Sequence, residues 1–415
     1  MTDTIMKILL YTQYFPPETN APANRWGYFA SYLTQKGYEV NVLTSFPNHP
    51  LGKIFDGYQN KWCFQEEKEE IKIIRSWTYI SSSWKFFPRF LNYLSFMFSS
   101  FFNSRLIGKV DLIIASSPPL SVGIVGAFIA KKRNIPLILD LRDIWPEAAE
   151  SAGYLKKNWL YRFFERWEKR IYNQALIILV NSESILKDLL CFKAVPRIKL
   201  FHLPNGADMD FFQNGIDCRF IEERYNLNNK FVVLYTGLLG FAQSPEIIAE
   251  TADLLKDKND IVFLVAGEGF LKKNLERKIK EYNLNNVILT GQRPRKEMPA
   301  FVKRADVCLV LYKNSSAFMK NVPSKIFDYM AAAKPMIINL DGEAGEIIRK
   351  SQSGLIVVPE DPAALSEGIL KFYNDRFLRE KAGRFAQTYA ANHYNKRDIA
   401  KKLEKILKNV ATKCI

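Results

Sequence analysis

The stretch that decides the fold runs from Phe231 to Lys256 and reads FVVLYTGLLGFAQSPEIIAETADLLK. Its first six residues, Phe231–Thr236, are uncharged and rich in β-branched and aromatic side chains, which is typical of a strand buried on both faces. Gly237 and Gly240 then interrupt the run, and Pro245–Lys256 repeats apolar residues at helical spacing. A buried strand followed closely by a helix predicts a βαβ unit of a parallel sheet.

The same alternation continues on both sides of this stretch. Later strands are predicted at Ile261–Ala266, Val287–Thr290, Val307–Leu311, Pro335–Leu340 and Gly354–Val358, and helices at Phe270–Tyr282 and Ser324–Ala333. Earlier strands are predicted at Ile5–Thr12, Tyr38–Thr44, Ile71–Arg75, Asp111–Ala115, Leu137–Leu141 and Ala175–Asn181, and helices at Ala21–Lys36, Leu120–Arg133, Asn158–Asn173 and Ser182–Leu190. The sequence therefore predicts an α/β protein with two doubly wound, Rossmann-like parallel-sheet domains facing a deep cleft.

A turn signal, Leu203-Pro204-Asn205-Gly206, separates the two series of strands. We place one domain at residues 1–204 and the other at residues 205–385. The last residues, 386–415, are predicted to form helices at Ala386–His393 and Asp398–Val410 that extend beyond the second core. Because ligands of doubly wound sheets bind at the carboxyl ends of the strands, the loops after the strands are expected to carry the function.

Composition and charge restrict the class of protein. The 415 residues are 48% hydrophobic and 25% charged, which indicates a globular chain. Lys and Arg total 59 against 43 Asp and Glu, a net charge of +16 that predicts an acidic partner such as a phosphate-bearing ligand or an anionic membrane face. We recognise no nucleic-acid-binding module in the sequence and expect no nucleic-acid partner.

Cysteines and histidines predict neither disulfides nor a metal. The five cysteines form no CxxC pair, and the three histidines lie far apart in the sequence. The start of the chain lacks the pattern of a signal peptide, so we expect a reduced, cytoplasmic setting.

One segment is unusually rich in phenylalanine. Trp84–Arg105 reads WKFFPRFLNYLSFMFSSFFNSR and is flanked by basic residues. Its uncharged run, Phe90–Asn103, is shorter than the roughly 20 apolar residues that a spanning helix needs. Two interpretations stay open: a basic, aromatic helix lying in the membrane interface, or a buried core helix.

The sequence Val322–Met330, VPSKIFDYM, is the strongest candidate for a phosphate site. A helix that starts near Pro323 with Ser324 as a cap, followed by Lys325, offers free N–H groups and a cation to an anion. Asp328 lies one turn further on the same face, where a carboxylate can accept hydrogen bonds from ribose hydroxyls. The alternative is an ordinary capped helix with a solvated carboxylate.

Loops after three predicted strands add weaker candidates for the same site. Glycines in such loops let the backbone approach a phosphate closely, although tight turns use glycine equally often. The candidate residues in these loops are Gly237, Gly240, Gln243, Gly267, Gly269, Gln292 and Arg293.

The N-terminal half has a loop, Asp140–Glu147, that crowds acids, Arg142 and Trp145 behind a buried strand. Arg142 can neutralise a phosphate, and Asp143 can bind sugar hydroxyls or orient Arg142. The alternative is a structural Arg–Asp pair with Trp145 packed against it. Candidates in the loop after the first strand and in the helix that follows are Glu18, Asn24 and Arg25, and Ser116–Pro119 follow another strand and are expected to line the same cleft.

In their order along the chain, these motifs resemble the family 4 glycosyltransferases, which have the two-domain GT-B fold. The matching residues are Lys7–Leu10, Phe15–Glu18, Arg142–Pro146, Leu203–Gly206, Gly237 with Gly240–Gln243, and Pro323–Tyr329. The sequence is most similar to the branch from bacterial O-antigen and capsule clusters that includes L-fucosamine (N-acetylfucosamine) transferases.

The resemblance implies a transfer reaction from a nucleoside-diphosphate sugar, such as a UDP-linked N-acetylated deoxyhexosamine, to a lipid-linked glycan. It places the donor in the C-terminal domain, with Asp328 on the ribose, Ser324 and Lys325 on the diphosphate, and Gln292 and Arg293 near the base. The catalytic residues it implies are Arg142, Asp143 and Lys325.

The same resemblance implies that the acceptor binds the N-terminal domain, through Glu18, Asn24, Arg25 and Trp145. The family transfers sugars with retention and without a catalytic metal or other cofactor, and residues 386–415 are expected to cross back to the N-terminal domain. Such an enzyme would act at the inner face of the cell membrane as a peripheral protein.

Three positions depart from the family pattern. Lys320 replaces the first glutamate of the Glu-x7-Glu motif, Asp328 is one methylene shorter than the second, and Arg142 stands where many members have histidine. The Lys320 change leaves open a non-catalytic scaffold that binds a nucleotide sugar. A second alternative is a GT-B sugar-nucleotide epimerase, which would use the same two sheets.

Overall fold

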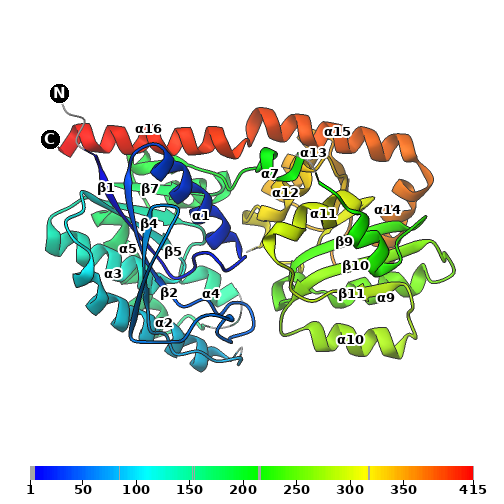
Figure 1. Cartoon of the computed structure of the whole chain (residues 1–415), viewed down its shortest axis with the longest axis horizontal. Helices are drawn as coiled ribbons and strands as arrows, with labels where there is room; N and C mark the ends of the chain where they lie inside the picture. The colour runs from blue at the N-terminus through cyan, green and yellow to red at the C-terminus, as the bar shows by residue number, and fades with distance from the viewer. Residues whose placement is uncertain are drawn as a thin grey trace. The chain divides into compact units, whose positions relative to one another are not determined.

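The computed structural model describes residues 5–83, 85–151, 153, 155–213, 216–315 and 318–414. They form two compact units (Figure 1): residues 1–204 with 400–415, here called the N-terminal unit, and residues 205–399, the C-terminal unit. Each unit has its own sheet and its own helices, and each is described by itself.

The N-terminal unit is built on an eight-stranded sheet in the order β3-β4-β2-β1-β5-β6-β7-β8. Its strands are β1 (Lys7–Thr12), β2 (Glu39–Ser45), β3 (Cys63–Lys68), β4 (Ile71–Ser76), β5 (Leu112–Ser117), β6 (Leu137–Leu141), β7 (Ile177–Val180) and β8 (Leu200–His202). All neighbours pair in parallel except β3, which is antiparallel to β4. The register sets Ile8 of β1 opposite Val40 of β2 and Leu112 of β5.

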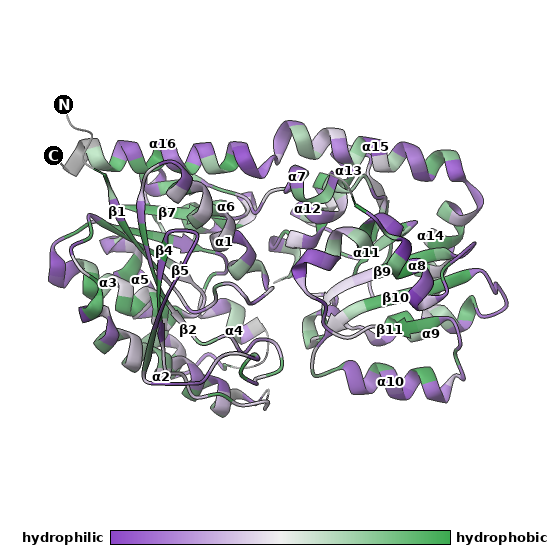
Figure 2. Ribbon diagram, viewed as in Figure 1, coloured by the Kyte–Doolittle hydropathy of each residue, from purple (hydrophilic) through white to green (hydrophobic). Residues whose placement is uncertain are grey.

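Helices follow most strands of this unit. They are α1 (Ala21–Gln35), α2 (Phe86–Asn103), α3 (Leu120–Arg133), α4 (Glu147–Ser151), α5 (Trp159–Gln174) and α6 (Glu183–Cys191), with residues from Ala400 onward of α16 (Lys396–Cys414). Alternate strand residues such as Leu9, Ile113 and Leu139 pack with apolar side chains of α3 in one buried core. The central strands β1, β5, β6 and β7 are accordingly mostly hydrophobic, as β1 and β7 show in Figure 2, which is expected of strands covered on both faces.

The C-terminal unit has a six-stranded, all-parallel sheet in the order β11-β10-β9-β12-β13-β14. The strands are β9 (Phe231–Leu238), β10 (Ile261–Glu268), β11 (Val287–Leu289), β12 (Val307–Val310), β13 (Met336–Ile338) and β14 (Gly354–Ile356). The helices are α7 (Met209–Gln213), α8 (Arg219–Tyr225), α9 (Glu246–Leu254), α10 (Lys272–Glu281), α11 (Met298–Arg304), α12 (Ser324–Ala331), α13 (Glu343–Ser351), α14 (Pro362–Asn374) and α15 (Arg376–His393).

The deciding strand β9 is buried on both faces, as its sequence predicts. Val233 and Tyr235 pack with the apolar face of α9, whereas Val232 and Leu234 pack with α11 and α12. This two-sided burial explains why no charged residue interrupts the strand. By contrast, α10 buries only Leu275 among its residues and is hydrophilic in Figure 2.

Each sheet has a switch point, where the strand order reverses. In the N-terminal unit it lies between β1 and β5, and in the C-terminal unit between β9 and β12. Chains leave adjacent strands in opposite directions at such a point, so a crevice opens at the carboxyl ends of the two strands. The loops after β9 and β12 are therefore neighbours.

Several elements differ from the prediction. The strand β3 was not predicted because its sequence, CFQEEK, is mostly exposed at the sheet edge and has no apolar face. The strand β8 and the helix α14 were also not predicted, and the helix expected at Ala386–His393 starts ten residues earlier, at Arg376. Residues 386–399 belong to the C-terminal unit, and the chain joins the N-terminal unit from Ala400.

The phenylalanine-rich segment forms α2, and Trp84 at its start lies outside the described residues. Phe96 is fully buried beside Tyr11, whereas Phe87 and Phe98 are exposed, so the helix has both a core face and a solvent face. In the part of the chain that the structure describes, no helix is both long enough and apolar enough to span a bilayer.

Candidate functional site

The switch point of the C-terminal sheet brings Gly237 at the end of β9 against Lys325 in the first turn of α12. A Cβ atom placed on Gly237 would lie 3.3 Å from Nζ of Lys325. Tyr329 fixes the helix there, because its hydroxyl accepts a hydrogen bond from the Thr236 amide at 3.1 Å and lies 2.8 Å from Oγ1 of Thr236. The predicted helix start and the predicted glycine loop therefore form one site.

The amine of Lys325 is buried and has no hydrogen-bond partner among the described residues. It lies 4.0 Å from the centroid of the Tyr235 ring, a cation–π distance. Burial lowers the pKa of this amine to about 7, since the charged form loses its hydration. An anionic ligand could therefore bind here, where this amine lies next to the backbone of a glycine.

The start of α12 differs in one respect from the prediction. Pro323, not Ser324, is the N-cap residue, and no described side chain caps the helix. Ser324 is instead the first helical residue, so the expected cap is wrong. Because an uncapped helix start leaves N–H groups without protein partners, it retains its capacity to bind an anion.

The glycines after β9 and β10 are required by close backbone packing. Gly237 and Gly267 are in register, and a Cβ on Gly267 would lie 2.0 Å from the carbonyl oxygen of Gly237. A Cβ on Gly269 would meet the carbonyl oxygen of Leu239 at 2.4 Å. Gly237 also has φ of +114°, which side chains disfavour. The two strand ends thus present backbone rather than side chains.

The carboxyl group of Asp328 is partly buried and hydrogen-bonds to no described residue. Burial raises its pKa, while the positive charges of Arg295 and Lys396 act in the opposite direction and Asp208 adds to the rise. Arg295 also lies over the Phe211 ring at 4.7 Å. Asp328 is therefore an acceptor held near two cations and available to hydroxyl donors.

The remaining predicted donor residues lie in the loops after β9 and β11. Gln243 is buried, its Oε1 has no described partner, and a Cβ on Gly240 would lie 2.9 Å from that oxygen. Arg293 donates to the Tyr225 hydroxyl and lies over that ring, while Gln292 is partly buried. Arg293 is thus held by a tyrosine to which no sequence motif pointed.

Sequence reasoning missed two ion contacts around these loops. Lys272 bonds Glu268 at 2.8 Å, and a Cβ on Gly291 would lie within 4 Å of both side chains. Lys313 lies 3.4 Å from the centroid of the Phe241 ring. The i,i+4 spacing of the first pair was a usable signal, but the second contact joins residues 72 positions apart.

In the N-terminal unit, Arg142 lies at the end of β6. Its Nη2 donates to the Pro118 carbonyl at 2.7 Å, and its Nε is 4.0 Å from Oδ2 of Asp140 and has no hydrogen-bond partner among the described residues. Burial lowers the pKa of the guanidinium, although the Asp140 and Asp143 carboxylates partly counter this. Asp143 beside it is partly buried, so both predicted catalytic groups of this loop lie at the strand ends near the switch point.

Arg25, predicted to bind the acceptor, belongs to the core of this unit. It is 1% exposed, and its guanidinium bonds Oδ1 of Asp140 at 3.1 and 3.2 Å. Its other donors reach the carbonyl groups of Leu203 and Pro204. Burial and these hydrogen bonds give Arg25 a structural role in this unit, and its contact with an acceptor stays a prediction.

Asp140 is the centre of that network and was not singled out by sequence reasoning. Its Oδ2 accepts from Nε1 of Trp26 and from Oγ of Ser116, each at 2.8 Å. The aspartate is fully buried in β6 and joins α1, β5 and β6. An aspartate inside an apolar strand, DL at the end of LILDL, was the available signal.

Glu18 and Asn24 hold their own loop. Oε1 of Glu18 accepts from the amides of Asn48 and His49, each at 2.9 Å, and the side chain is buried. Nδ2 of Asn24 donates to the Thr19 carbonyl. Burial raises the pKa of Glu18 to about 7 despite these bonds. The buried carboxyl group of Glu18 thus joins its own loop to the loop of Asn48 and His49, and its contact with an acceptor stays a prediction.

We expect Glu18→Gln to make the protein more stable than wild type at pH 8 and little different at pH 5. The raised pKa of Glu18 favours the protonated form in the fold, so its contribution is present below its ordinary pKa of 4.5 and is lost as pH rises through about 7. Glutamine keeps the acceptor oxygen and cannot ionise. The difference in unfolding free energy should grow by about 3 kcal/mol across this range.

Thermal midpoints at pH 5, 6, 7 and 8 measure this effect. Glu367→Gln, at an exposed position of α14, is the matched control and should show no such trend. A constant difference between Glu18→Gln and wild type at all four pH values would contradict the buried, proton-binding state of Glu18.

Comparison with known proteins now gives the class. Residues 23–211 match the family model described as Glycosyltransferase Family 4, and residues 219–389 match the model described as Glycosyl transferases group 1. A protein of Escherichia coli (strain K12), named as the colanic acid biosynthesis glycosyl transferase WcaI, is 26% identical over 408 residues, which cover 95% of this chain and 98% of that protein.

Solved structures show the same fold. Sucrose-phosphate synthase from Thermosynechococcus elongatus has a TM-score of 0.75 at 16% identity and covers 98% of this chain and 99% of its own. Anabaena Alr3699/HepE in complex with UDP and glucose has a TM-score of 0.68 at 17% identity, with 97% and 100% covered. The chain is a glycosyltransferase with the GT-B fold and family 4 and group 1 domains, which confirms the predicted fold class and enzyme class.

Proposed function

We propose that the protein transfers a sugar from a nucleoside-diphosphate sugar, UDP-linked, to a lipid-linked glycan during the synthesis of a bacterial surface polysaccharide. The observation that carries the donor half of this proposal is the buried, unpartnered amine of Lys325 at the uncapped start of α12. The colanic acid assignment of the WcaI relative supports the polysaccharide, and the UDP bound to Anabaena HepE supports the base.

The diphosphate would lie between the start of α12 and the end of β9. The amides of the first turn and the Lys325 amine supply positive charge, and Gly237 leaves space for the phosphate to approach the backbone. The ribose hydroxyls would donate to the carboxyl group of Asp328, which hydrogen-bonds to no described residue. Gln292 and Arg293 would lie by the base, in the loop after β11.

Charge on the diphosphate leaving group grows as its bond to the sugar breaks. Preorganised N–H groups and cations lower the barrier because they are already oriented toward that charge. The negative charge of a bound diphosphate would raise the pKa of Lys325, which burial lowers in the free protein. Lys325 would then carry its full positive charge. These groups can act without a metal, and we propose a metal-independent, retaining transfer, as in the resembling family.

The acceptor would approach the loops at the switch point of the N-terminal sheet. Arg142 and Asp143 are the candidates for contact with the reacting sugar, and Trp145 follows them in the same loop. Arg142 retains an Nε without a hydrogen bond, which suits it to bind a phosphate or hydroxyl oxygen. The excess of basic residues would favour an anionic membrane face, so we propose a peripheral enzyme.

A thermal-shift screen with UDP, GDP, TDP and ADP tests the donor site. A ligand that binds only the folded protein raises its apparent stability by mass action. We expect UDP to raise the melting temperature and Asp328→Ala to lose most of the rise, because the ribose hydroxyls lose their acceptor.

Asp253→Ala, which removes an exposed ion pair with Lys256 in the same unit, is the matched control and should respond to UDP as wild type does. Stabilisation by a different nucleotide would replace UDP in the proposal. No response to any of the four would refute the donor site at α12.

A further inference from the structure

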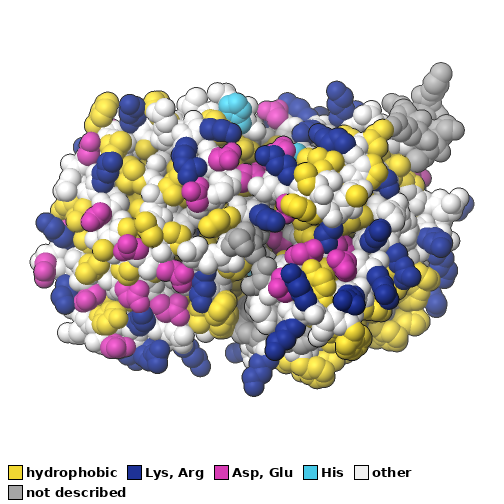
Figure 3. Space-filling view, turned by 180° about the vertical axis from the view of Figure 1, so that it is seen from behind, with side chains coloured by type: hydrophobic (Ala, Val, Ile, Leu, Met, Phe, Trp, Pro, Cys, Tyr) yellow, Lys and Arg dark blue, Asp and Glu magenta, His cyan; other side chains and the backbone are white. Residues whose placement is uncertain are grey.

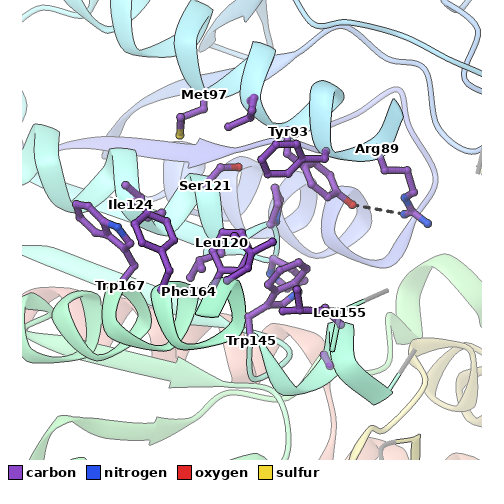
Figure 4. Close-up of a pocket in the computed structure, with 18 residues that line it drawn as sticks. Arg89, Tyr93, Met97, Leu120, Ser121, Ile124, Trp145, Leu155, Phe164 and Trp167 are labelled. Atoms are coloured by element: carbon purple, nitrogen blue, oxygen red, sulfur yellow. Dashed lines mark hydrogen bonds between the residues drawn. The ribbon is translucent and has the colours of Figure 1, made fainter. Parts of the chain in front are cut away.

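The N-terminal unit contains an apolar cavity that the donor site does not use. It has a volume of about 480 Å³ and lies among α2, α3, α4 and α5 (Figure 4). Trp145, Phe164 and Trp167 form one wall, and Leu94 and Met97 of α2 form another. The volume falls within the roughly 300–1,000 Å³ typical of small-molecule sites.

Few polar groups interrupt this lining. Ser121 of α3 and Arg89 and Tyr93 of α2 are the exceptions besides the indole groups. Oγ of Ser121 is buried and has no hydrogen-bond partner in the part of the chain that the structure describes, and Figure 4 shows the side chain directed into the space between the helices. A water-binding or sugar-binding cavity would need several convergent polar groups, so an apolar occupant fits this one.

A smaller, polar hollow adjoins the cavity and shares Arg89 and Tyr93 with it. Tyr14, Asn48 and Asn92 are among its other lining residues. Arg89 lies at the junction, with Nη2 3.5 Å from the Tyr93 hydroxyl, as Figure 4 shows. The two spaces together would suit a molecule with a long apolar part and a polar, anionic part.

The cavity also reaches the loop that holds Arg142. Pro118 lines the cavity, and its carbonyl accepts the hydrogen bond from Arg142. A chain in the cavity would therefore end close to the strand ends where the sugar acceptor is proposed to bind.

The surface around the cavity is aromatic and basic. Phe87 and Phe98 on α2 and Phe163 on α5 are 65%, 57% and 46% exposed. The segment from Lys85 to Lys109 has four Lys and Arg residues and no carboxylate. Figure 3 shows hydrophobic side chains gathered along the lower edge of this unit with Lys and Arg beside them. Exposed apolar surface of this kind marks an interaction site, and its charge complements a phosphate.

We propose that this cavity binds the hydrocarbon chain of the lipid-linked acceptor, with Arg89 beside its phosphate. The proposal rests on the proposed function and adds a lipid subsite to it. Burial of a linear chain between Leu94, Ile124 and Trp167 would be favourable in proportion to the apolar area covered. The guanidinium would hold the phosphate at the polar hollow, so that the glycan points toward the strand ends.

Quenching of tryptophan fluorescence by 12-bromododecyl phosphate tests this subsite, because Trp145 and Trp167 line the cavity. We expect saturable quenching below the micelle concentration, and loss of most of it in the Trp145→Phe, Trp167→Phe double variant. Ser121→Phe and Ile124→Phe each fill the cavity and should weaken binding at least tenfold. Leu106→Phe, at an exposed position outside the cavity, is the matched control and should change binding less than twofold.

The variant Arg89→Gln tests the phosphate contact separately from the hydrocarbon contact. It should weaken binding of 12-bromododecyl phosphate and leave 12-bromododecanol unaffected, while inorganic phosphate should not compete. Unchanged affinity in both cavity-filling variants, or quenching that appears only with phosphatidylglycerol vesicles, would overturn the proposal in favour of a surface contact. If the wild-type protein is stabilised by UDP, such a result would refute this lipid subsite alone. If UDP does not stabilise the wild-type protein, the proposed function is refuted.

Discussion

Lys325→Met is expected to weaken UDP binding by about 10- to 100-fold while raising the melting temperature of the nucleotide-free protein. A charge-assisted hydrogen bond to phosphate is lost, which accounts for the first effect. The second arises because the wild-type fold holds an amine that is buried without a partner, and a methionine of similar length has no such cost. Transfer itself should fall about 100- to 1,000-fold, since the lost cation also acts on the leaving group.

The pH dependence has a definite sign. The pKa of Lys325 is lowered to about 7 in the free protein, so the fold gains stability as pH rises from about 7 toward the ordinary value of 10.5. The stabilisation by Lys325→Met should therefore be larger at pH 6 than at pH 9. Wild-type affinity for UDP should fall above pH 7, whereas Lys325→Arg, charged throughout, should lack that component.

Calorimetric titration with UDP and melting curves at pH 6 and 9 measure both effects. Lys334→Met is the matched control, because this lysine also lies in the C-terminal unit and burial also lowers its pKa, but it is not part of the site. The control should bind UDP within threefold of wild type. Lower stability of Lys325→Met, or undiminished UDP affinity, would show that the amine has a structural partner instead of a ligand.

Asp140→Ala is expected to cost about 3–5 kcal/mol of stability and to leave little folded N-terminal unit at 37 °C. The aspartate is the counter-ion of Arg25, and both side chains are at most 1% exposed. Removing one partner leaves a buried guanidinium without its carboxylate, which costs more than the net value of the pair. Trp26 and Ser116 lose their acceptor at the same time.

The double variant Arg25→Met, Asp140→Leu separates charge from packing. It should be more stable than Asp140→Ala, because no uncompensated charge remains. Urea unfolding of the three proteins measures the difference, and Asp253→Ala, at an exposed ion pair, should lose less than about 1 kcal/mol. If Asp140→Ala also lost less than about 1 kcal/mol of stability, the network would not be what holds α1, β5 and β6 together.

The fold could be predicted well where burial forces a pattern on the sequence. The strands β1, β5, β6, β9 and β10 are covered on both faces, so most of their residues are apolar, and Asp140 in β6 is the exception that its buried partners explain. Elements at the edges could not be predicted in the same way. The strand β3 has a mostly exposed, charged sequence, and its antiparallel pairing with β4 depends on tertiary contacts that no local pattern encodes.

The candidate site could be predicted in its parts but not in its connections. The serine, lysine and aspartate of α12 were visible as a phosphate pattern, and the structure places the lysine beside Gly237. What the sequence could not give is which polar side chains are already satisfied. In the sequence, Arg25 and Glu18 look like binding residues. In the structure, Arg25 bonds Asp140, which lies 115 residues away, and Glu18 accepts hydrogen bonds from two backbone amides about 30 residues away.

The Asp140 network has a consequence for how this unit can change over evolution. Apolar positions such as Leu9 or Ile113 can exchange one aliphatic residue for another with modest cost, one position at a time. Arg25, Trp26, Ser116 and Asp140 have no such freedom, because each single change leaves a buried donor or acceptor behind. These four positions can therefore change only together during evolution, whereas the apolar positions of the same core can change one at a time.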